Sequence, residues 1–135
     1  MTQLFFLEIV YLLLGSFLLL SDSYGVRYPV LLSLRHQFRM NPRFRFFLIL
    51  IGCVLMTLSV FLPYDPGPPL LGDLLVTLNL LFLVVWFLVK AKKVKGEETV
   101  FVEASQYVEK NMQVFGFLTM GVAVIHFLVP MSVLL

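Results

Sequence analysis

The residues best suited to chemistry in this sequence are a few polar side chains inside long apolar runs. Glu8 interrupts LFFLEIVYLLLG near the start of the chain, and His126 interrupts GVAVIHFLVP near its end. Both side chains can exchange protons, and an ionisable group at the centre of a bilayer costs about 2.5–3.5 kcal/mol, so such groups are functional candidates by default. With Thr57 and Asn79, they form the predicted intramembrane polar layer.

The spacing of these residues predicts which helix faces turn inward. On the first apolar run, Glu8 shares a face with small and polar neighbours at spacings of three and four, namely Tyr11 and Gly15. On the last run, the corresponding face carries Gly116, Thr119, Ala123 and His126. Small residues permit close packing and polar residues bond across helices, so we expect these faces to meet and Glu8 to face His126.

Two interpretations of Glu8 stay open. It could handle protons or cations, or it could be a structural hydrogen-bond partner or a carboxylate that reaches outward to water from about one turn inside the interface. For His126 we favour a neutral imidazole bonded to Glu8 or Asn79, because His36 belongs to the opposite surface and Cys53 is not near a plausible ligand spacing. We predict no catalytic residue, no metal and no cofactor.

The composition predicts an all-α membrane protein. The 135 residues are 60% hydrophobic and only 13% charged, with a mean hydropathy of +0.97, whereas soluble domains are nearer half apolar and a quarter charged. Four runs approach the ~20 residues needed to cross a bilayer. We therefore predict one four-helix transmembrane domain over residues 1–135, with spans at Leu4–Leu20, Phe46–Leu62, Leu70–Val89 and about Met112–Leu135, of which the first two are slightly short.

The basic residues predict the orientation. All ten Lys and Arg residues fall between the first and second spans or between the third and fourth. Short loops rich in Lys and Arg stay in the cytoplasm. We therefore predict two basic cytoplasmic loops, both termini outside, and a location in the plasma (inner) membrane.

Each basic loop contains an amphipathic segment. PVLLSLRHQFRM predicts a short interfacial helix with Pro29 at its first position, and we expect Arg35, Arg39 and Arg43 to contact lipid or a partner. In EETVFVEASQYVEK the polar face is acidic and carries Glu98 and Glu103. An acidic face suits either the basic first loop or a partner protein, and the sequence does not choose between them.

Three classes of function follow. The leading hypothesis is a non-enzymatic subunit or accessory of a larger membrane complex, or a homo-oligomer, whose partners are the bilayer and another membrane protein or a second copy. The alternative is a small oligomeric proton- or cation-coupled transporter that uses Glu8. The third is a membrane-bound enzyme acting on lipid head groups, although no nucleophile with an adjacent base can be named. We predict no nucleic-acid partner.

One feature of the transporter hypothesis is shared with a known family. A carboxylate in the first of four short helices resembles the small multidrug resistance transporters, which place their coupling glutamate there. The resemblance implies that Glu8 would be the coupling group. The sequence departs from that family in its long connecting loops and in lacking evident pocket aromatics in the second and third spans.

Overall fold

The computed structural model describes residues 2–61, 74–94 and 102–128, and within these ranges the chain is helical with no strand. The helices are α1 (Thr2–Tyr24), α2 (Pro29–Met40), α3 (Pro42–Phe61), α4 (Leu74–Val94), α5 (Val102–Lys110) and α6 (Met112–Leu128). The predicted all-α class is confirmed.

Three of these helices, α1, α3 and α4, are long and apolar enough to cross a membrane. A fourth span is obtained only if α5 and α6, which are bent by 78° at their junction, are counted as one broken span. The chain is thus consistent with an integral membrane protein, and the four-span count stays a prediction.

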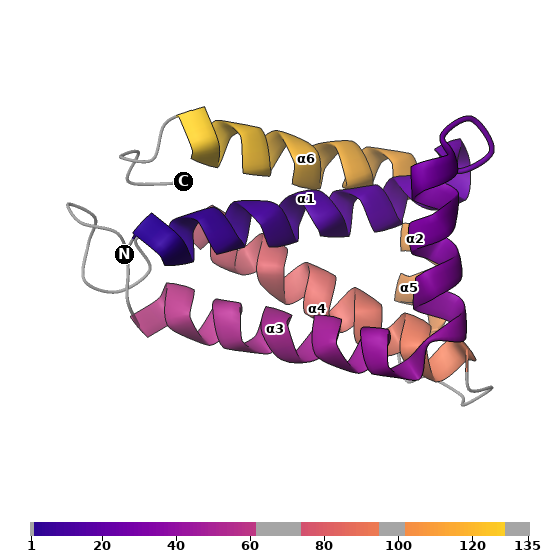
Figure 1. Ribbon diagram of the computed structural model, residues 1–135, viewed down its shortest axis with the longest axis horizontal. Coiled ribbons are helices and arrows are strands. Elements are labelled where there is room, and N and C mark those ends of the chain that lie inside the picture. Colours follow the sequence, from indigo (N-terminus) through magenta and orange to yellow (C-terminus); the bar gives the residue numbers. More distant parts are fainter. Residues whose placement is uncertain (1, 62–73, 95–101, 129–135) are drawn as a thin grey trace.

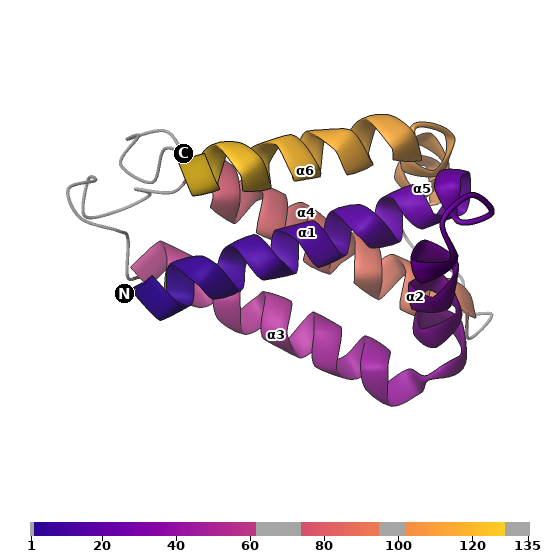
Figure 2. The same ribbon diagram turned by 45° about the horizontal axis from the view of Figure 1, so that its top comes forward.

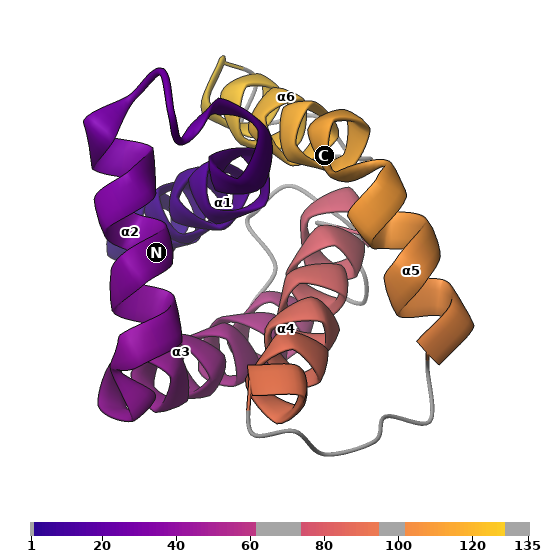
Figure 3. The same ribbon diagram turned by 90° about the vertical axis from the view of Figure 1, so that its right-hand side faces the viewer.

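The long helices lie side by side, and the two short ones lie across one end of the bundle (Figure 1). Viewed from that end, α2 bridges α1 and α3, while α5 leads into α6 (Figure 3). We call this end, where α2 and α5 lie, the basic end; the start of α1 and the end of α6 lie at the opposite, far end (Figure 2). Within the bundle, α1 packs chiefly on α6 and α3 chiefly on α4.

A compact junction holds α2 across the basic end. Asn41 is the single residue between α2 and α3, and its Oδ1 accepts hydrogen bonds from the backbone N–H groups of Arg43 (3.1 Å) and Phe44 (3.3 Å), as an N-cap does. Pro42 at the first position needs no such bond. The buried guanidinium of Arg45 donates a hydrogen bond of 2.8 Å from Nη1 to the carbonyl oxygen of Arg39. This bond gives a partner to one of the last carbonyl groups of α2, which have none within the helix.

Helices α1 and α3 are longer than the first two predicted spans. The predicted segments counted only the uninterrupted apolar residues, whereas α1 has 23 residues and α3 has 20. At the basic end α1 continues through Asp22, which pairs with Arg35, and α3 begins with a turn that contains Arg45, which donates to carbonyl oxygens of α2. The proline-rich turn, residues 70–73 of the third span and residues 129–135 of the fourth lie outside the described residues.

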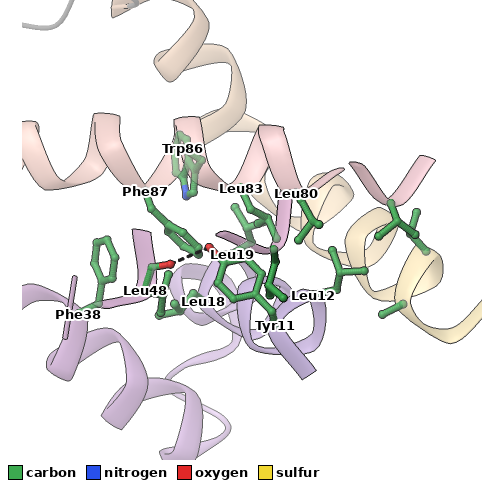
Figure 4. Close-up of a cluster of buried hydrophobic side chains, with 14 of the residues drawn as sticks. Tyr11, Leu12, Leu18, Leu19, Phe38, Leu48, Leu80, Leu83, Trp86 and Phe87 are labelled. Carbon is green, nitrogen blue, oxygen red and sulfur yellow. Dashed lines mark hydrogen bonds between the residues drawn. The ribbon is translucent and has the colours of Figure 1, made fainter. Parts of the chain in front are cut away.

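The core lies between α1, α3, α4 and α6, with Phe38 of α2 at its edge, and leucines and aromatic rings interdigitate in it (Figure 4). Tyr11 of α1 donates a hydrogen bond of 3.0 Å from its hydroxyl to the carbonyl oxygen of Leu48 in α3. Close approach of the helices depends on glycine. A Cβ at Gly15 would lie 2.5 Å from Leu83 Cδ1, and a Cβ at Gly116 would lie 2.7 Å from Leu20 Cγ. Small residues at crossings are typical of helix packing in membranes.

Candidate functional site

A buried polar pair lies near the far end of the bundle. Glu8 of α1 and His126 of α6 are 2% and 0% exposed, and Oε2 of the carboxylate lies 3.7 Å from Nε2 of the imidazole. The ring of Phe5 covers the imidazole, with 4.6 Å between ring centroids. The structure thus places the two side chains facing each other, and the burial of Glu8 excludes the alternative in which its carboxylate reaches outward to water.

A second polar contact joins α4 to α6. Thr119 donates a hydrogen bond of 3.1 Å from Oγ1 to Oδ1 of Asn79, and both side chains are buried. Thr119 and His126 are two turns apart on one face of α6, so the two polar contacts share that face. Within the described ranges, Nδ2 of Asn79 has no hydrogen-bond partner. Asn79 is therefore bonded between helices, as the sequence suggested.

Thr57 does not join this layer. Its side chain is exposed on α3, and its hydroxyl donates to the carbonyl oxygen of Cys53, one turn back, at 2.8 Å. The polar contact of α3 is instead made by Ser59, whose Oγ lies 2.9 Å from Oγ1 of Thr77 in α4. Residues two apart on a helix point about 200° from each other, so Thr57 and Ser59 cannot both face inward.

The basic end holds a partly open cavity of about 560 Å³. Its charged lining consists of Asp22, Arg35, Arg39, Lys90, Lys93 and Glu109. Its apolar lining includes Leu18, Phe38, Trp86, Phe87 and Met112. Five helices contribute to it: α1, α2, α4, α5 and α6.

A chain of ion pairs connects four helices around this cavity. Asp22 of α1 pairs with Nε of Arg35 in α2 at 2.8 Å and lies 3.8 Å from Nζ of Lys90 in α4. The same Lys90 Nζ lies 3.1 Å from Glu109 of α5, which also accepts a hydrogen bond of 2.9 Å from Lys93. The network fixes α2 and α5 against the ends of α1 and α4.

The lysines also set the protonation of Glu109. Partial burial alone raises the pKa of this carboxyl, but hydrogen bonds and charge from Lys93 and Lys90 outweigh it, so the pKa lies below its ordinary value of 4.5. Glu109 is therefore ionised at neutral pH. Within the described residues, Glu109 of the acidic segment thus pairs with lysines at the end of α4.

The predicted contact residues lie in different places. Arg35 and Arg39 line the cavity, whereas Arg43 and Glu103 are exposed and do not line it. Glu98 lies outside the described residues. Sequence reasoning missed Asp22, and it did not place Trp86 in a site. Asp22 had a signal: it is the single acidic residue between Glu8 and Asp65, and it directly precedes the first basic loop.

Comparison with known proteins leaves the site without a named counterpart. A model of a family of unknown function matches residues 1–126, which is nearly the whole chain. No curated protein and no solved structure matches. The chain therefore belongs to this family of unknown function.

Proposed function

We propose that this protein is a non-enzymatic integral membrane subunit that assembles, in the plasma (inner) membrane, with a larger membrane complex or with a second copy of itself. In this proposal the basic end faces the cytoplasm, because basic residues are retained there, and both termini lie outside. The observation that supports assembly most is the uncovered side of α3.

Helix α3 is the least enclosed of the three helices that are long and apolar enough to cross a membrane. In its apolar stretch 28% of the residues are buried, against 56% in that of α1. It packs chiefly on α4, and it leaves large apolar side chains exposed along its length: Phe46, Phe47, Leu50, Ile51, Val54 and Phe61. In membranes, helices associate in part through van der Waals packing between the side chains of their facing surfaces. A peripheral helix with such a surface is the natural site for a neighbouring protein.

Transport by Glu8 is the second candidate, supported by the burial of its carboxylate beside His126. Against it, Glu8 and Asp22 are about 21 Å apart along α1, and fully buried leucines lie between the polar pair and the charged cavity: Leu12, Leu19, Leu80 and Leu83. A conduction path through the monomer would need these side chains to move. Proton-coupled uptake into proteoliposomes would favour transport.

A site-directed photocrosslinking experiment tests the assembly proposal. In a Cys53→Ala background, Val54→Cys places a thiol on the exposed side of α3, and Val124→Cys places one on α6 as a matched control; the native valines are 50% and 42% exposed. A thiol-attached photocrosslinker is activated in native membranes. We expect protein adducts from position 54 and few from position 124. Equal adduct yields, or none from either, would contradict an α3 interface.

A further inference from the structure

The geometry points to a binding site for the phosphate head group of an anionic lipid in the cavity at the basic end. This inference does not depend on which protein, if any, covers α3. It rests on the size of the cavity, on its charges and on its apolar floor.

The volume suits a ligand larger than a simple ion. At about 560 Å³, the cavity falls within the roughly 300–1,000 Å³ typical of small-molecule sites. Its lining residues come from α2, from α5 and from the adjoining ends of α1, α4 and α6, so it lies at the level where the apolar helices end. In a membrane this level is the head-group region, so lipid can reach the cavity from the side.

The charges favour an anion. Four cationic side chains line the cavity against two carboxylates. Both carboxylates are already engaged, Asp22 with Arg35 and Glu109 with Lys90 and Lys93. Arg39 lines the same cavity, and no ion pair of its guanidinium is seen within the described ranges. A planar guanidinium fork binds phosphate oxygens in pairs, which makes Arg39 the principal anion ligand of the site.

The floor favours an amphiphile over a free anion. Phe38 and Phe87 pack with ring centroids 5.6 Å apart, and Nζ of Lys90 lies 4.9 Å from the centroid of the Trp86 ring. Leu18 and Met112 complete an apolar surface below the cations. A soluble phosphate gains nothing from this surface, whereas the glycerol and upper acyl chain of a lipid bury apolar area against it.

Trp86 makes the site directly observable, because it is the only tryptophan in the chain. The full-length protein is reconstituted in phosphatidylcholine nanodiscs with increasing fractions of phosphatidylglycerol carrying brominated acyl chains, which quench tryptophan on contact. We expect quenching that saturates at a low fraction of the anionic lipid. Brominated phosphatidylcholine in the same discs should quench only in proportion to its abundance.

Two variants that each remove one positive charge distinguish binding in the cavity from general attraction of anionic lipid to the basic surface. Arg39→Gln removes the proposed ligand, and Arg43→Gln removes an exposed arginine that does not line the cavity. We expect Arg39→Gln to raise the half-saturating lipid fraction roughly ten-fold, as loss of one charged hydrogen-bonding group does, while Arg43→Gln stays at the wild-type value. Circular dichroism checks that both variants are folded.

Three results would overturn the assignment. Quenching by phosphatidylglycerol that rises only in proportion to its abundance would show no site. Equal shifts in both variants would show only a basic surface attracting lipid. Inorganic phosphate added at constant ionic strength could also relieve the quenching. If phosphatidylglycerol and phosphatidylcholine then quenched equally, the cavity would be a site for a soluble anion rather than for a lipid.

Discussion

Glu8 and His126 are buried inside the helix bundle, where the cost of charge is high. The 3.7 Å between Oε2 and Nε2 is longer than a hydrogen bond, and both side chains are almost fully buried. Even if both groups were charged, a buried pair would be weak evidence for stability, because desolvation offsets much of the attraction. Glu8 and His126 therefore have either a structural role, as polar neighbours inside the bundle, or a functional role in proton exchange.

Two substitutions of Glu8 distinguish these roles by stability. We expect Glu8→Gln to fold normally, because an amide still forms hydrogen bonds and its burial carries no charge. Glu8→Leu should lower the free energy of unfolding by about 1 kcal/mol, since it removes the carboxylate beside the imidazole. Unfolding of the three forms in mild detergent measures both effects.

The functional outcome uses the same variants. If Glu8 is structural, the Gln form should also keep partner association at the wild-type level. A Gln form that folds and assembles normally but loses proton-coupled uptake would refute the structural interpretation and support transport, since only a titrating group exchanges protons.

Glu109 gives a prediction of pH dependence at the basic end. Its pKa is lower in the folded protein than its ordinary 4.5 because of Lys93 and Lys90. A lowered carboxyl pKa contributes stability above the unfolded-state pKa, and that stability is lost as the pH falls through the folded-state value. We expect α5 to loosen from α4 below about pH 4.5, with a cost of at most about 1 kcal/mol per surface ion pair.

Hydrogen exchange of the α5 backbone as a function of pH measures this loosening. Glu109→Gln should weaken protection at neutral pH and remove the acid-dependent step, whereas Glu103→Gln, on the same helix but exposed, should change neither. If Glu109→Gln kept the acid-dependent loss of protection in α5 unchanged, the Glu109 carboxyl would be excluded as the group that causes it.

At the scale of the helices, Gly52 sets how closely α3 approaches α1 and α4. A Cβ at this position would collide with the hydroxyl of Tyr11 and lie 2.6 Å from Cγ2 of Val84. Tyr11 cannot easily move aside because its hydroxyl is bonded to Leu48. Gly52→Ala should therefore cost about 1–3 kcal/mol through overpacking.

Gly121 on α6 is the matched control for this substitution. A Cβ there would meet nothing within 4 Å, so Gly121→Ala should leave stability unchanged or raise it by about 0.4–1 kcal/mol. Thermal unfolding of both variants in one detergent makes the comparison. Equal destabilisation by the two substitutions would contradict the close crossing at Gly52.

The helices were more predictable from the sequence than the contacts between them. PVLLSLRHQFRM coincides with α2, because proline at its start and periodic apolar residues are local signals. Glu8 opposite His126 followed from matching helix faces. Thr57 was placed wrongly because polarity alone does not tell which face turns inward, and the Asp22–Lys90–Glu109 network was missed because its members lie far apart in the chain.

At the scale of the whole molecule, the helix arrangement makes the orientation testable. Ser33 is exposed on α2 at the basic end, and Gln3 is exposed at the start of α1 at the far end. In a Cys53→Ala background, we expect an impermeant maleimide to label Gln3→Cys in intact cells and Ser33→Cys only after permeabilisation. The reverse pattern would invert the proposed orientation.

Assembly is the central claim, and the mass of the protein taken gently from its own membrane tests it most directly. The free chain has a mass of 15.5 kDa. Native mass spectrometry after extraction in mild detergent or lipid nanodiscs should give a heavier species, either a multiple of this mass or a complex with another membrane protein. A strictly monomeric 15.5 kDa species in both detergent and bilayer would contradict the account.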